Sequence, residues 1–155
     1  MKLEPLGATA DLPALAAELS PGFGGDDASA RELLKQTLAL LTGDPRPAPW
    51  GAYLARSEGA TVGTCAFKAA PDSEGVVEIA YMTFPAHERR GHATAMAAEL
   101  VGIARVAGAR TVIAHTLRED NGSTRCLARN AFAMTGEVID PEDGPVWRWE
   151  LPLGR

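Results

Sequence analysis

Hydrophobic and polar positions along this chain switch between the spacing of strands and the spacing of helices. Val76–Phe84 is rich in β-branched and aromatic residues and is followed by Pro85, which predicts a strand. From Gly91 to about Gly108, apolar residues recur every three or four positions, which predicts a helix with one apolar face. Thr111–Leu117 is strongly apolar, as expected of a strand inside a sheet.

The same criteria predict the other elements. Further strands are expected at Met1–Leu6, Trp50–Arg56, Thr61–Ala69, Phe132–Ile139 and Val146–Leu151, and helices at Ala10–Leu19, Ala28–Leu41 and Asn121–Asn130. Ser29 is the expected cap of the second helix, and Asn121 or Ser123 that of the last. The order β-αα-βββ-α-β-α-ββ predicts one α/β domain over residues 1–155, with a mixed sheet of about seven strands and about four helices.

The amino-acid composition limits the kinds of partner that we expect this protein to bind. The net charge of -5 and the lack of a long basic stripe argue against nucleic acid. No run approaches the roughly 18 apolar residues that a membrane span needs, and Met1–Pro5 is no signal peptide. Cys65 and Cys126 are isolated and predict no disulfide framework. We therefore expect a cytoplasmic protein with reduced thiols and no membrane partner.

The start of the helix at Gly91 is the first candidate for chemistry. Arg89-Arg90-Gly91-His92-Ala93 leads into it without a Ser, Thr, Asp or Asn immediately ahead as a cap. A helix start leaves about four backbone N–H groups unpaired, at the positive end of the helix dipole. An uncapped start that contains glycine and is flanked by arginine favours an anion, and phosphate in particular.

Other site chemistries find no support. His87 and His92 are five positions apart, about 140° around a helix, which does not suit a zinc pair. Cys65 and Cys126 do not add ligands at close spacing. Neither a G-x-S-x-G elbow nor a phosphate-binding G-K-S/T occurs, so we expect no metal and neither hydrolase nor NTPase activity.

Two segments carry a family resemblance. Glu88-Arg89-Arg90-Gly91-His92-Ala93 is similar to the pyrophosphate loop Q/R-x-x-G-x-G/A, and Asn121–Phe132 is similar to N-x-S-x-R-V-L-E-K-x-G-F. In this arrangement of elements, the chain resembles the GNAT acyltransferase superfamily, and within it the ribosomal-protein alanine N-acetyltransferase-like branch. Glu88 departs from the loop pattern and is expected to point outward. Leu127 stands where many relatives carry a tyrosine that protonates the leaving thiolate.

The resemblance implies acetyl-CoA as co-substrate and assigns residues to it. The backbone around Met82 would polarise the thioester carbonyl, and Thr83 and Phe84 would bind the pantetheine amides where two strands separate. Asn121 and Ser123 would line the CoA arm. The pyrophosphate would lie on a loop made of Arg89, Arg90, Gly91, His92, Ala93 and Thr94.

Glu78 and Ser123 are the candidate catalytic residues. Glu78 shares a strand face with Ala80, Met82 and Phe84, and apolar neighbours would raise its pKa and make it a usable base. The alternative is a solvated glutamate, with His115 as the next candidate base. Ser123 supplies a hydroxyl one helical turn earlier on the same face, four positions before Leu127. It would relay a proton to the sulfur; alternatively it only caps its helix, or the thiolate leaves without an acid.

The function implied is an N-acetyltransferase in which a primary amine, of a small molecule or a protein N-terminus, attacks acetyl-CoA directly. The loop Ser20–Asp27, the turn Pro141–Gly144 and the Trp147/Trp149 strand are expected to border the acceptor pocket, with their carboxylates favouring a cationic amine. Two alternatives stay open: a non-catalytic acyl-CoA-binding or regulatory module, and a structural α/β domain with a fortuitous loop. Either a monomer or a homodimer is expected.

Overall fold

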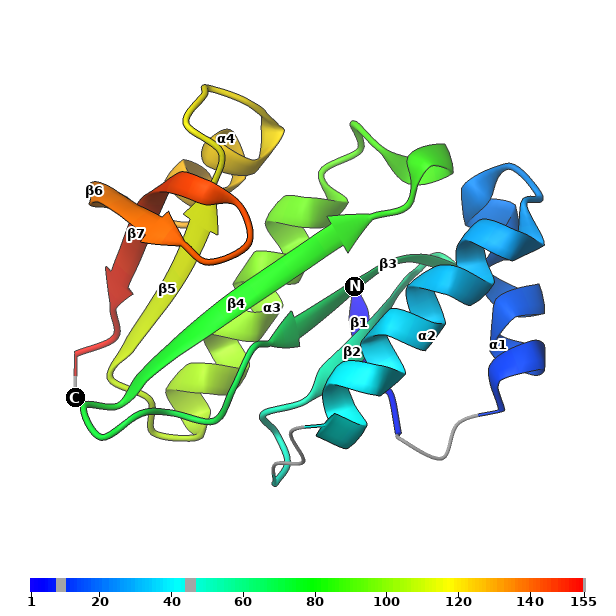
Figure 1. Ribbon diagram of the computed structural model, residues 1–155, viewed down its shortest axis with the longest axis horizontal. Coiled ribbons are helices and arrows are strands. Elements are labelled where there is room, and N and C mark those ends of the chain that lie inside the picture. The colour runs from blue at the N-terminus through cyan, green and yellow to red at the C-terminus, as the bar shows by residue number, and fades with distance from the viewer. Residues whose placement is uncertain (8–10, 44–46, 155) are drawn as a thin grey trace.

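The computed structural model describes residues 1–7, 11–43 and 47–154, and its strands form a seven-stranded sheet (Figure 1). The strands are β1 (Lys2–Pro5), β2 (Ala52–Ser57), β3 (Ala60–Phe67), β4 (Val76–Thr83), β5 (Thr111–Thr116), β6 (Ala133–Asp140) and β7 (Gly144–Pro152). The helices are α1 (Leu12–Leu19), α2 (Asp27–Gly43), α3 (His92–Val106) and α4 (Gly122–Arg129), with short 3₁₀ turns at Ser20–Phe23 and Pro85–His87. Ala10, the expected start of the first helix, lies outside the described residues.

The sheet has the strand order β1-β2-β3-β4-β5-β7-β6. β4 and β5 run parallel, joined by α3, whereas the other neighbouring strands are antiparallel. The predicted element order and the mixed α/β sheet are therefore confirmed.

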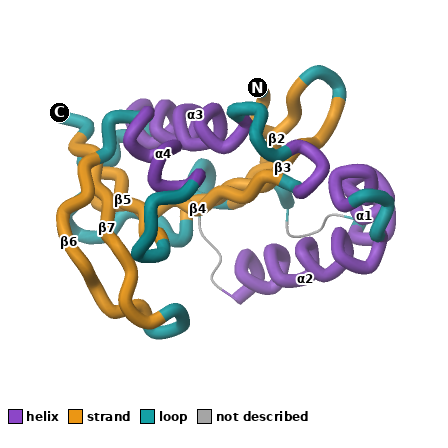
Figure 2. Tube along the Cα trace, turned by 90° about the horizontal axis from the view of Figure 1, so that it is seen from above, coloured by secondary structure: helices purple, strands orange, loops and turns teal. Residues whose placement is uncertain are grey.

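Helices cover both faces of the sheet (Figure 2). On one face, α3 and α4 bury Met96, Leu100 and Leu127 against strand residues that include Val77 and Ile79. On the other face, α1 and α2 form a second core. The β6–β7 hairpin extends to the same side of the sheet as α2. Among the described residues, no helix is both long and apolar enough to cross a membrane.

The strands β4 and β5 separate along their length. Their parallel register runs only from Val76 and Thr111 to Glu78 and Ile113. The pairing of β4 with β3, by contrast, continues to Thr83. The second half of β4 therefore presents backbone groups toward β5 that the β4–β5 ladder does not use, at the point where the resemblance places the pantetheine.

The structure confirms Asn121, one of the two expected caps of α4, but not Ser29 as the cap of α2. Asn121 caps α4: its side chain accepts from the backbone N–H of Thr124 at 3.0 Å, and the Thr124 hydroxyl accepts from the backbone N–H of Asn121 at 2.9 Å. Ser123 is therefore free of the capping role. Ser29 is not the cap of α2, because it donates from its backbone and its hydroxyl to Asp26, which precedes the helix.

Candidate active site

The first cavity lies at the N-terminus of α3 and has a volume of about 640 Å³. It is enclosed by the end of β4, the loop into α3 and one face of α4. Seven of the residues assigned to acetyl-CoA line it: Thr83, Arg89, Gly91, His92, Ala93, Thr94 and Ser123. Arg90, Met82, Phe84 and Asn121 do not.

The backbone at the start of α3 has the form expected of an anion site. Gly91 occupies the N-cap position with φ 81° and provides no side-chain hydrogen bond to the helix, so the predicted uncapped start is confirmed. Arg89 also has a positive φ of 64°. A left-handed residue followed by a helical one turns successive N–H groups into one concavity, and nothing lies within 4 Å of the point where a Gly91 Cβ would be. The loop therefore leaves space for an anion in front of these groups.

Arginines give this cavity its charge. Arg125 and Arg129 of α4 join Arg89 in the lining, and sequence reasoning missed them as ligands. The sequence did contain a pattern that could have indicated them, because positions 122, 125, 126 and 129 share one face of a helix. Glu88 also lines the cavity and is exposed to solvent, and the outward direction of its side chain stays a prediction. Three guanidinium groups against one carboxylate still suit a polyphosphate.

His92 is neutral over a wider pH range than an ordinary histidine. Its pKa is lowered, first by burial and then by the positive charge of His87 and Arg90 nearby. The ring lines the first cavity at the positive end of α3, where a bound phosphate would offset that unfavourable environment.

The second cavity lies on the other side of the separated strands and has a volume of about 300 Å³. Its ionisable side chains come from β4, β5, the end of β3 and the β6–β7 hairpin: Lys68, Glu78, Tyr81, His115, Asp140 and Asp143.

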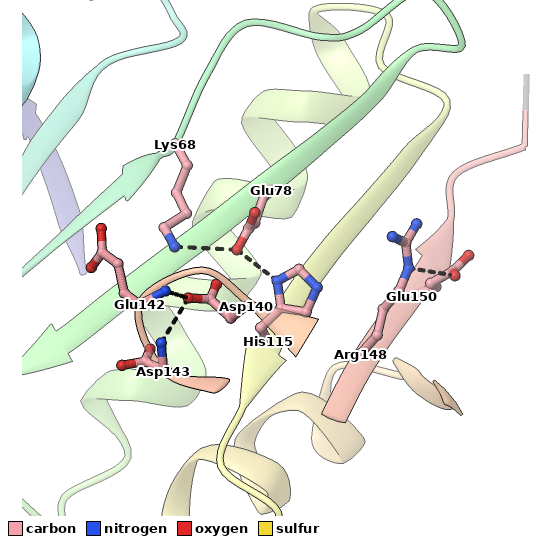
Figure 3. Close-up of polar contacts among 8 residues, drawn as sticks. All are labelled: Lys68, Glu78, His115, Asp140, Glu142, Asp143, Arg148 and Glu150. Atoms are coloured by element: carbon pink, nitrogen blue, oxygen red, sulfur yellow. Dashed lines mark hydrogen bonds and ion pairs between the residues drawn. The ribbon is translucent and has the colours of Figure 1, made fainter. Parts of the chain in front are cut away.

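Glu78 is the centre of this group (Figure 3). Its Oε2 lies 2.9 Å from Nδ1 of His115 and 3.3 Å from Nζ of Lys68. The side chain of Glu78 is 24% exposed, so it is neither fully solvated nor fully buried. The expectation that Glu78 lies among apolar neighbours is wrong. The side chains of Lys68 and His115, which come from other parts of the sequence, contact its carboxylate.

The hairpin contributes a second carboxylate. Asp140 accepts hydrogen bonds from the backbone N–H groups of Glu142 at 2.8 Å and Asp143 at 3.0 Å (Figure 3). These bonds lower the pKa of Asp140, with the bond from Asp143 having the larger effect, so it remains ionised. Of the acidic residues expected around the acceptor, Asp143 lines this cavity. Asp26, Asp27 and Glu142 line neither of the two cavities, and β7 contributes Val146 rather than its tryptophans.

Tyr81 and Ser123 are the residues that line both cavities. The Tyr81 hydroxyl lies 3.2 Å from Oγ of Ser123 and 3.4 Å from its carbonyl oxygen. Burial raises the pKa of Tyr81 well above its ordinary value, so the phenol stays protonated. Sequence reasoning missed Tyr81, which it treated only as a strand residue. The two residues therefore mark the place where the two cavities adjoin.

The backbone of β4 indicates which of the N–H groups around Met82 face β5. The Phe84 N–H bonds to Val62 of β3, and the Glu78 carbonyl accepts from Lys68. Since antiparallel pairs alternate, the N–H of Met82 also faces β3, whereas those of Tyr81 and Thr83 face β5. A donor to a thioester carbonyl between β4 and β5 is therefore offered by Tyr81 or Thr83. Phe84 is fully buried in the core beneath α1 and α2.

Most of this chain matches a known protein family. The model of the acetyltransferase (GNAT) domain matches residues 2–133. The chain belongs to the GNAT acetyltransferase family. The predicted family is therefore confirmed, and with it the class of acetyl-CoA-dependent acyltransferases. Comparison with curated protein sequences gives no match.

Solved structures share the GNAT fold at low sequence identity. RimJ of Mycobacterium smegmatis, in complex with CoA-disulfide, is 16% identical with a TM-score of 0.75, over 97% of this chain and 80% of that one. The ribosomal L7/L12 alpha-N-protein acetyltransferase RimL is 15% identical with a TM-score of 0.72, over 99% and 93%. The yncA protein of Salmonella typhimurium, solved with acetyl-CoA, is 16% identical with a TM-score of 0.65, over 100% and 95%.

Proposed function

We propose that this GNAT protein transfers the acetyl group of acetyl-CoA to a primary amine by direct attack of the amine on the thioester. The observation that carries the proposal is the meeting of two cavities at Tyr81 and Ser123. One cavity is lined by arginines and a helix N-terminus, and the other holds Glu78 and His115. A thioester entering from the first side and an amine from the second would meet at these hydroxyls.

Acetyl-CoA is assigned to the first cavity. Its pyrophosphate would accept hydrogen bonds from the backbone N–H groups that follow Gly91, with Arg89, Arg125 and Arg129 supplying positive charge. The pantetheine would run along the β5 side of β4, where the strand pairing has ended after Glu78. This path leads the thioester to Tyr81 and Ser123.

Glu78 is proposed as the base that removes the proton of the attacking amine. An aliphatic amine has a pKa of about 10.4 and arrives protonated, so it must lose a proton before it can attack. The contact of 2.9 Å between Glu78 Oε2 and His115 Nδ1 gives that proton a path onward through the imidazole. Lys68, at 3.3 Å from the same oxygen, would fix the position of the carboxylate.

Ser123 and Tyr81 are proposed to stabilise the leaving sulfur. The neutral amine nitrogen forms a bond to the carbonyl carbon and loses one proton. The C–S bond breaks, and the sulfur leaves with the electron pair and takes up one proton, so that the proton count is unchanged. The Tyr81 hydroxyl would donate to Ser123 Oγ, and Ser123 to the sulfur. Leu127 stands where many relatives carry a tyrosine, and it is fully buried in the core. The hydroxyls of Tyr81 in β4 and Ser123 in α4 would take the role of that tyrosine.

The acceptor class can be tested with purified protein, acetyl-CoA and a panel of amines. We expect release of the CoA thiol in step with formation of the N-acetylated amine. Binding of acetyl-CoA, seen as a raised melting temperature, without thiol release for any amine would instead support the non-catalytic acyl-CoA-binding alternative. A cytoplasmic location stays a prediction.

A further inference from the structure

A third cavity adjoins the proposed acceptor cavity on the side of α2. It has a volume of about 180 Å³ and shares Ala80 and Tyr81 with the acceptor cavity. Its other lining residues come from α2, β2, β3 and β4: Leu33, Thr37, Ala52, Thr64, Cys65, Ala66 and Met82. We call these nine residues the α2 trough.

The floor of the α2 trough is set by the strand register. Ala52 pairs with Ala66, and Ala66 pairs with Ala80, so three small side chains lie side by side across β2, β3 and β4. Met82 is 40% exposed on the same face, although it belongs to a central strand of the sheet. A large apolar side chain left open to water in the middle of a sheet, next to a reaction site, has the character of a ligand contact.

We infer that the α2 trough receives an apolar substituent of the acceptor, so that the substrate is a primary amine with an apolar group next to its amino-bearing carbon. This inference rests on the proposed amine acetyltransfer. Continuity is the reason for assigning the α2 trough to the acceptor: an amine placed at Glu78 has Ala80 and Tyr81 on the shared wall between the two cavities.

The two sides of the acceptor site differ in charge. On the hairpin side, Glu78 and Asp140 can receive the ammonium group. The two ionisable residues that line the α2 trough, Cys65 and Tyr81, direct their side chains to the opposite face of the sheet from Ala66 and Ala80, because neighbouring strand residues alternate. The lining of the α2 trough therefore offers an ammonium group no charged side chain. A second ammonium group would lose its hydration here without gaining a counter-ion, so a wholly polar polyamine fits poorly.

The inference can be tested with amines that differ in one substituent. Glycinamide, serinamide and leucinamide carry the same primary amine beside hydrogen, a hydroxymethyl group and an isobutyl group, and spermidine is the polar comparison. We expect kcat/KM for leucinamide to exceed that for serinamide by about tenfold or more, since an apolar pocket discriminates weakly against small changes and strongly only when several carbons are buried.

Two variants of α2 locate the effect. Thr37 lines the α2 trough, and its hydroxyl donates to the carbonyl of Leu33 in the same helix, at 3.0 Å. Thr37→Asp adds a charge there and should lower kcat/KM for leucinamide by about tenfold, with less than about twofold change for glycinamide. Thr37→Val should leave leucinamide acetylation equal or faster. Gln36→Asp, an exposed neighbour outside the α2 trough, adds the same charge and should change neither rate.

Three results would overturn the inference. One is equal kcat/KM for serinamide and leucinamide in the unaltered protein, and another is a Thr37→Asp variant that loses activity equally with all amines. A third is a clear preference for spermidine. If acetyl-CoA binds but no amine is acetylated, the proposed amine acetyltransfer itself fails, and this inference with it.

Discussion

Removal of the Ser123 hydroxyl is expected to slow the chemical step while the cap of α4 stays intact. The α4 cap is made by Asn121 and Thr124, at 3.0 Å and 2.9 Å, and survives in Ser123→Ala. A hydrogen bond to a charged group contributes about 1.5–3 kcal/mol, which corresponds to about 10- to 150-fold in rate if the sulfur carries the charge. The free energy of unfolding should fall by about 0.5–1.5 kcal/mol at most, because the part-buried hydrogen bond between Ser123 Oγ and the Tyr81 hydroxyl is lost.

Tyr81→Phe tests the partner of the same hydrogen bond. The Tyr81 hydroxyl lies 3.2 Å from Ser123 Oγ, and loss of a neutral hydrogen bond of this kind costs about 0.5–1.5 kcal/mol, or about 2- to 13-fold in rate. Because Tyr81 acts through Ser123, the double variant should be no slower than Ser123→Ala alone. Tyr53→Phe is the matched control, since Tyr53 donates to the Pro49 carbonyl and lines neither of the two cavities.

The assay is single-turnover formation of the acetylated amine, with enzyme in excess over acetyl-CoA, which isolates chemistry from product release. Thermal unfolding of each variant reports stability separately. If Ser123→Ala and Tyr81→Phe both keep the rate of the unaltered protein within about twofold, the hydroxyls do not stabilise the leaving sulfur. If the Ser123→Ala variant loses stability but keeps the single-turnover rate, Ser123 has only a structural role.

Three further perturbations probe the base, the phosphate loop and the pH response. Glu78→Gln should lower kcat by about 10²-fold or more with little change in CoA affinity, and near-normal turnover would place the base elsewhere. Gly91→Asp, at φ 81° and facing the expected phosphates, should weaken CoA binding by more than about tenfold in calorimetry; unchanged affinity in a folded variant would contradict the site. The pKa of His92 is lowered in the folded protein, so the unfolded chain binds the proton more readily, and stability should fall as the pH drops below about 6.5. His92→Asn should flatten that part of the profile of melting temperature against pH, and parallel profiles would refute the linkage.

The fold could be predicted because its signals are local. Val76–Phe84 and Thr111–Leu117 have the composition of strands, and the apolar spacing after Gly91 fixes α3 to within a few residues. Pro85 and Gly91 mark the ends of these elements, since one cannot continue the ladder and the other adopts φ 81°. The uncapped start of α3 was predictable for the same reason.

The chemistry of the site depended on contacts between distant residues and could be predicted only in part. Ser123 lies 42 positions from Tyr81, and His115 lies 37 positions from Glu78. Strand alternation placed Glu78 on the correct face but could not supply Lys68, which reaches it from the end of β3. The acidic residues of the Ser20–Asp27 loop were assigned to the acceptor pocket because of their charge alone. The charge of a residue does not show where the fold places it.

Initial rates of CoA thiol release, measured while acetyl-CoA and the amine are both varied, test whether the acetyl group passes directly between the two cavities. The geometry predicts intersecting double-reciprocal lines, with one N-acetylated amine formed for each thiol released, because both substrates must be bound at Tyr81 and Ser123 together. Parallel lines, accompanied by an acetylated enzyme when acetyl-CoA is added alone, would contradict direct attack and show a covalent route instead.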